Sequence, residues 1–87
     1  MEKHYLNRTE PIPDTGTSSV VLDIEAWPEH PGMVRATITV ILAHARRSEG
    51  VYLSDEPITE QEAETRAQAA AAEHRIGIIY VRGPADS

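Results

Sequence analysis

Apolar and polar residues alternate along three stretches of the first two thirds of the chain, and this alternation predicts β-strands. In residues 20–27, every second residue is apolar and the opposite face carries two carboxylates. Residues 33–44 repeat the pattern over a longer stretch that is rich in β-branched side chains, which favour strands. Residues 51–54 repeat it briefly, with Val51 and Leu53 expected to face the helix. Proline- and glycine-containing or polar turns separate the three, which predicts a meander.

The pattern then changes to a helical period and ends in a last short strand. Thr59 and Glu62 form a Thr-x-x-Glu capping box, which predicts a helix that begins there and runs to about residue 75. Gly77 is the expected C-terminal glycine. Residues 78–82 predict the last strand. One stripe of the helix consists of Ala63, Ala67, Ala70, Ala71 and His74.

This order predicts an α+β fold of the β-β-β-α-β type, a two-layer sandwich. Its sheet would be four-stranded and mostly antiparallel, with one helix packed on one face. We expect the last strand beside the first, which gives the order third, second, first, fourth. Residues 20–83 form the single domain in this prediction. Residues 1–19, rich in proline and turn-forming residues, are expected to be a flexible arm, and residues 84–87 a C-terminal tail.

Composition narrows the classes of protein that this chain can represent. Eighty-seven residues make one domain with a thin core, and no cysteine is present to reinforce it. A net charge of −6 disfavours nucleic acid as a partner. We find no apolar stretch long enough to cross a bilayer and no signal peptide, so we expect a cytoplasmic protein with no membrane role. The arginine and alanine bias suggests a bacterial or phage source.

No motif points to a reaction, a metal or a cofactor. The histidines lack the i, i+3 or i, i+4 spacing of metal ligands, and only folding could bring His44 and His74 together. Asp23 and Glu25 could act as an acid–base pair, although carboxylates at this spacing more often form a solvated strand face. Ser54 precedes the helix without a nucleophile elbow. We therefore expect no small-molecule ligand.

The sheet face away from the helix is the most informative predicted surface. One helix covers one face, and the other face would expose several apolar side chains, which usually marks an interface. The sequence therefore predicts a non-catalytic interaction or regulatory module that forms a homodimer or binds a protein partner through this face. Alternatively, the N-terminal arm folds back and covers it. If the last strand has the opposite orientation, it presents Ile78 and Tyr80 on this face in place of Ile79 and Val81. The expected interface residues are Val21, Trp27, Ile41, Tyr52, Ile79 and Val81.

Two other functions remain open at this point. Arg46 and Arg47 lie in a predicted turn, and Arg35 lies on the same sheet; with Tyr52 as a stacking platform, they could bind a single-stranded nucleic acid or an acidic partner. The third possibility is a small enzyme or an enzyme subunit, which would need a pocket with clustered polar groups. We rank the interaction module first and the enzyme last.

Overall fold

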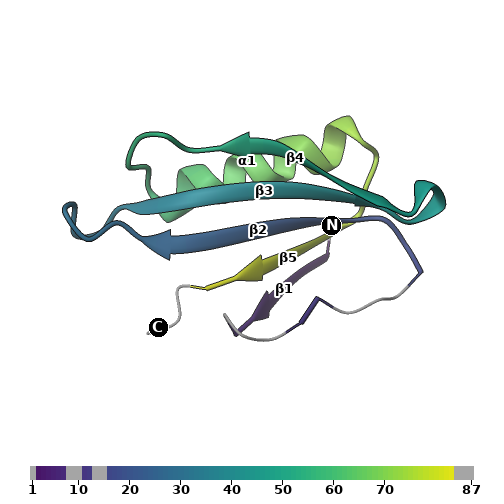
Figure 1. Ribbon diagram of the computed structural model, residues 1–87, viewed down its shortest axis with the longest axis horizontal. Coiled ribbons are helices and arrows are strands. Elements are labelled where there is room, and N and C mark those ends of the chain that lie inside the picture. The colour runs from purple at the N-terminus through teal and green to yellow at the C-terminus, as the bar shows by residue number, and fades with distance from the viewer. Residues whose placement is uncertain (1, 8–10, 13–15, 84–87) are drawn as a thin grey trace.

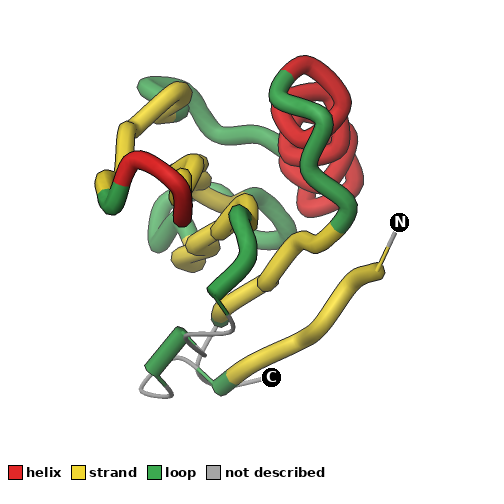
Figure 2. Tube along the Cα trace, turned by 90° about the vertical axis from the view of Figure 1, so that its right-hand side faces the viewer, coloured by secondary structure: helices red, strands yellow, loops and turns green. Residues whose placement is uncertain are grey.

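Five strands form one mixed sheet, and one helix lies across one of its faces (Figure 1). The computed structural model describes residues 2–7, 11–12 and 16–83. Viewed along the strands, the sheet and the helix form two layers (Figure 2). The elements are β1 (Glu2–Leu6), β2 (Ser19–Ala26), β3 (Val34–Leu42), the 3-10 turn η1 (Ala43–Ala45), β4 (Arg47–Leu53), α1 (Glu60–Glu73) and β5 (Ile78–Arg82).

The strand order is β1-β5-β2-β3-β4. β2, β3 and β4 form the predicted antiparallel meander, and β5 enters beside β2, parallel to it. The α+β class and the order of the four predicted strands are therefore confirmed. The prediction of a four-stranded, mostly antiparallel sheet is wrong, because β1 adds a fifth strand parallel to β5.

β1 lies within the residues that were expected to form a flexible arm. Its side chains are mostly exposed, and it joins the sheet through its backbone, beginning with Glu2 N–H donating to the Gly77 carbonyl at 2.8 Å. Lys3 Nζ also donates to Glu64 Oε1 on α1 at 2.6 Å, and this hydrogen bond raises the pKa of Lys3 above its ordinary value. The predicted C-terminal tail lies outside the described residues, as does part of the predicted arm.

The core lies between α1 and the strands β2, β3 and β5. Thr59 Oγ1 accepts a hydrogen bond from Glu62 N–H at 3.1 Å, so the predicted cap begins the helix. Ala63, Ala67 and Ala71 are fully buried on the face of α1 that meets the sheet. Alanine adds little apolar area, but it lets helix and sheet approach closely. The other core side chains come mainly from the alternating apolar residues of β2 and β3.

The end of α1 differs in detail from the prediction. The helix ends at Glu73, and Arg75 takes the left-handed conformation with φ 56°, so the chain turns two residues before Gly77. Ile76 then enters the core with 5% of its surface exposed. The isoleucine thereby secures the turn that leads into β5.

Candidate functional site

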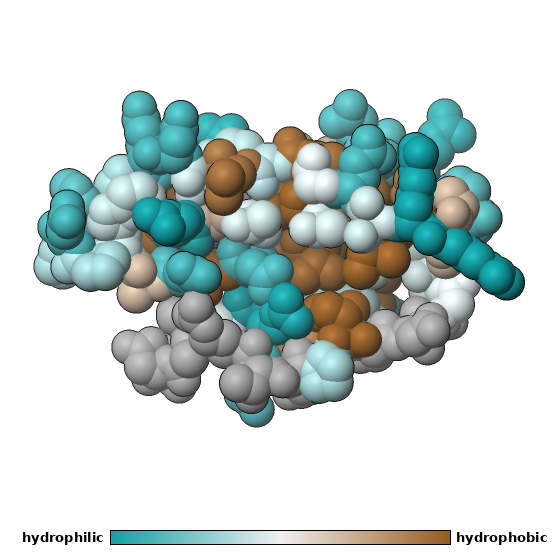
Figure 3. All heavy atoms as spheres, in the orientation of Figure 1, coloured by the Kyte–Doolittle hydropathy of each residue, from teal (hydrophilic) through white to brown (hydrophobic). Residues whose placement is uncertain are grey.

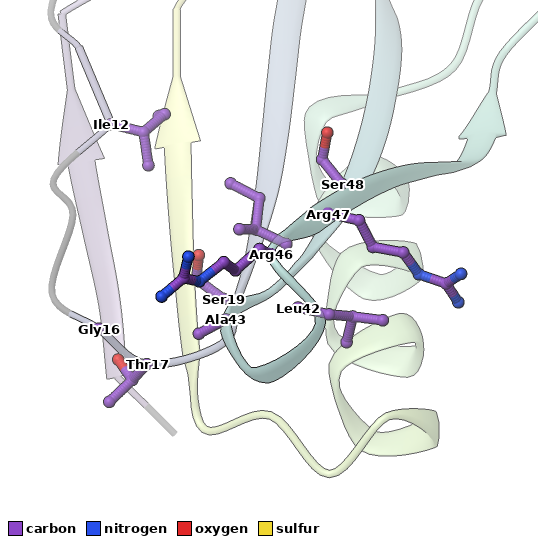
Figure 4. Close-up of a pocket in the computed structure, with 10 residues that line it drawn as sticks. Ile12, Gly16, Thr17, Ser19, Leu42, Ala43, Arg46, Arg47 and Ser48 are labelled. Atoms are coloured by element: carbon purple, nitrogen blue, oxygen red, sulfur yellow. The ribbon is translucent and has the colours of Figure 1, made fainter.

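The sheet face opposite α1, hereafter the outer face, is partly covered by the chain itself. Val21 and Tyr80 lie on it, yet only 3% and 4% of their surfaces are exposed. Ile12, from the segment between β1 and β2, lies against this face near β5 (Figure 4). The His4 ring stacks on Tyr80 with a centroid distance of 5.6 Å. The outer face is therefore less available to a partner than the sequence predicts.

Two of the predicted interface residues lie on the wrong side of the sheet for that role. Ile79 pairs with Val20 and Val81 pairs with Leu22, so both face α1. They are 1% and 2% exposed and belong to the core. Both faces of β5 are apolar, so periodicity alone left its orientation open. Pairing with β2 decides it, and the outer face receives Tyr80 instead.

The predicted position of Tyr52 on the outer face is also wrong. A β-bulge separates the pair Thr39–Gly50 from the pair Ile38–Tyr52, which leaves Val51 as an extra residue in β4. Because Ile38 faces the core, Tyr52 turns toward α1, where the Arg66 guanidinium lies 4.7 Å from the centre of its ring.

The bulge also places Leu53, expected in the core, on the outer face. Leu53 pairs with Thr37, which belongs to the outer set of β3. Leu53 is 65% exposed and Val51 is 40% exposed. The surface that sequence reasoning missed is therefore the β4 side of the sheet.

Trp27 is half-buried rather than a free anchor. The Arg35 guanidinium lies 4.6 Å from the centre of its ring, and His30 packs against it edge-on at 6.2 Å. These contacts make a small cluster at the end of β2, where the chain turns into β3. The tryptophan supports this turn, and nothing in its surroundings requires a partner.

The three predicted partner arginines do not form one basic patch. Arg35 lies at the start of β3 on Trp27, whereas Arg46 and Arg47 follow the other end of that strand. Arg46, with φ 52°, extends over a hollow, and Arg47 points away from it (Figure 4). Arg47 Nη2 lies 3.7 Å from Glu49 Oε2 on the same strand.

The hollow beneath Arg46 has a volume of about 690 Å³ and is open to solvent. Ile12 and Ile41 are among the apolar residues that line it, and Ser19 is among the polar residues. Ser18 Oγ accepts a hydrogen bond from Ala43 N–H at 3.1 Å, which holds the entering segment at this end of the sheet. Ile41, a predicted interface residue, is thus half-buried by the chain itself.

The groups weighed for catalysis are engaged in structural contacts. Asp23 Oδ1 accepts a hydrogen bond from Arg82 Nε at 2.6 Å. Ser54 is buried, and its hydroxyl accepts from Ala36 N–H at 2.8 Å. His74 Nδ1 lies 3.1 Å from the Ala70 carbonyl on its own helix. Within residues 2–7, 11–12 and 16–83, no three histidine, aspartate or glutamate side chains gather as metal ligands would.

The most exposed large apolar side chains of the described residues lie at the two edges of the sheet. Among the described residues, the large apolar side chains with the most exposed surface are Tyr5 on β1 and Val51 and Leu53 on β4. The outer face between them is mixed, with pale and apolar groups across its middle and hydrophilic groups toward both ends (Figure 3). The β4 edge is thus the best candidate for a binding surface.

Comparison with known protein families, curated proteins and solved structures found no match, so the surface is interpreted from its geometry alone. No helix in the described part of the chain has the length and apolar content that crossing a membrane requires.

Proposed function

We propose that this protein is a non-catalytic interaction module that binds a protein partner along β4. One observation carries the proposal: β4 is a terminal strand of the sheet, and it carries Val51 and Leu53 with large exposed fractions. A terminal strand presents backbone donors and acceptors that an added strand can pair with. Exposed apolar side chains on such a strand supply contacts beyond the backbone ladder.

The opposite edge of the sheet is less suited to this role. On β1, Lys3 forms an ion pair with Glu64, and the His4 ring lies 3.2 Å from a carboxylate oxygen of Glu2. Charged side chains on an edge strand disfavour the approach of another strand, and on β4 they are confined to Arg47 and Glu49 in its first half. Tyr5 is exposed there, but the Lys3 ammonium lies 6.0 Å from the centre of its ring. We therefore place the binding surface on β4.

We expect the module to act in the cytoplasm, because a chain without cysteine suits a reducing compartment. We do not extend the proposal to nucleic acid. The net charge is −6, and Arg46 and Arg47 are separated from Arg35 by the length of β3.

Site-specific photocrosslinking tests the proposal. A photoreactive phenylalanine analogue would replace Leu53 in the full chain, and matched chains would carry it at Tyr5 and at Gln68, an exposed residue of α1. After irradiation in the producing cells, position 53 should give a discrete adduct whose partner mass spectrometry identifies. Added unlabelled protein should compete for it, and a Leu53→Lys competitor should not. Equal labelling at all three positions, or no adduct at position 53, would refute the proposal.

A further inference from the structure

We propose that the partner on β4 is a second copy of this chain, with the two β4 strands running antiparallel and joining the two sheets into one. This inference rests on the proposed interaction surface and names its occupant. An isologous contact of this kind needs a strand that is complementary to itself when reversed. β4 has that property in both its charges and its apolar residues.

The charges at the two ends of β4 are opposite. Arg47 begins the strand, and Asp55 follows its end after one intervening residue. Both side chains are exposed, and Arg47 points away from the hollow (Figure 4). In an antiparallel pair the start of each strand meets the end of the other, so two Arg47–Asp55 pairs form by symmetry. A parallel pair would instead place like charges together, which is unfavourable.

The apolar residues fit the same arrangement. The register that places Arg47 opposite Asp55 also places Val51 opposite Val51 of the second copy. Leu53 lies two residues from this axis on each strand, opposite Glu49 of the second copy, so Val51 is the exposed apolar side chain at the centre of the contact. Apolar groups at the centre with charges around them is the usual anatomy of an interface.

The acidic residues that follow β4 form no ion pair with the rest of the described chain. The structure records no ion pair for Asp55 or Glu56 among the described residues. Arg47 lies 3.7 Å from Glu49 in an exposed ion pair, which is worth little in solution. An incoming Arg47 therefore displaces no ion pair between Asp55 and residues 2–7, 11–12 or 16–83.

Sedimentation across a concentration series tests the second copy directly. The wild-type chain should pass from 9.6 kDa at low concentration to twice that mass at high concentration. Arg47→Glu and Asp55→Arg should each weaken self-association at least tenfold, because each creates two like-charge contacts. The double variant should restore most of it. Val51→Lys should abolish it, because it places two lysines opposite each other on the axis, whereas Tyr5→Lys, on the other edge, should leave it unchanged.

The outcomes separate this inference from the proposed function. A chain that stays monomeric up to millimolar concentration overturns the dimer, as does a dimer indifferent to both charge reversals. If the adduct at position 53 then contains a different protein, the interaction module stands and only its occupant changes. If position 53 gives no adduct and the chain is monomeric, both proposals fall. Circular dichroism of each variant confirms that a loss of association is not a loss of folding.

Discussion

Replacing Ser54 with alanine tests how β4 is held in place. Ser54 is 3% exposed, and its hydroxyl oxygen lies 2.8 Å from the backbone nitrogen of Ala36, which is fully buried in β3. The variant removes the acceptor and leaves this N–H without a partner in a site that water does not reach. A buried donor left unsatisfied costs about 1–3 kcal/mol.

That cost is a large fraction of the total for a chain of this size. At about 0.05–0.15 kcal/mol per residue, a domain of this length has a free energy of unfolding of roughly 4–13 kcal/mol. Each kcal/mol lost should lower Tm by about 4–8 °C. Urea denaturation followed by circular dichroism measures the change, and the slope with denaturant should stay constant because the exposed surface is the same.

Two matched variants make the result interpretable. Ser48→Ala, at an exposed position of the same strand, should change the free energy of unfolding by less than about 0.5 kcal/mol. Ser54→Thr keeps the hydroxyl and should retain most of the stability. If Ser54→Ala and Ser48→Ala prove equally mild, the reasoning that this hydroxyl satisfies a buried donor is refuted.

Two further substitutions test the packing of the helix and the last strand. Ala67→Glu should prevent folding, because Ala67 is fully buried against the sheet and a carboxylate there finds neither room nor a partner; circular dichroism should show an unfolded chain, while the exposed Gln68→Glu folds normally. A cooperative transition near the wild-type midpoint would contradict this. Gly83→Ala should cost at least about 1–2 kcal/mol, because Gly83 has φ 89° and a Cβ there would lie under 3.0 Å from the Ile24 carbonyl oxygen. Gly77→Ala, which meets nothing within 4 Å, is the control, and equal Tm values for the two variants would rule out the clash.

Local pattern was sufficient wherever each face of an element has one character. Every second residue of β2 from Val20 to Ile24 and of β3 from Val34 to Val40 is apolar, and these residues lie in the core as predicted. α1 carries both an N-terminal capping threonine and an alanine stripe, and both occur in the structure. These elements could be predicted from the sequence because the side of each element that is buried carries apolar residues.

β1 could not be predicted this way, because its exposed side chains do not alternate between apolar and polar residues. Residues 2–5 are exposed, and the strand exists because its backbone completes the edge of β5. β5 poses the opposite problem, since Ile78, Ile79, Tyr80 and Val81 are apolar on both faces. Which pair faces the helix depends on the register with β2, a long-range contact that periodicity does not encode.

The candidate binding surface depends on one extra residue. Without the bulge at Val51, the alternation of β4 would bury Val51 and Leu53 and expose Tyr52, as the sequence pattern predicts. Two contacts oppose that register: Ser54 Oγ binds Ala36 N–H, and Tyr52 packs on the core beneath Arg66. An aromatic ring buries more area than an aliphatic side chain, so burying Tyr52 offsets part of the cost of exposing Leu53.

The same serine that holds the end of β4 therefore also determines which residues this edge presents. Ser54 lies opposite Ala36 and faces the core with Tyr52, so the intervening Leu53 must point to the outer face. A shift of one residue would break the serine hydrogen bond and exchange the two faces of the strand. The pairing register of β4 with β3 therefore determines both the stability of this end of β4 and which side chains the binding surface exposes.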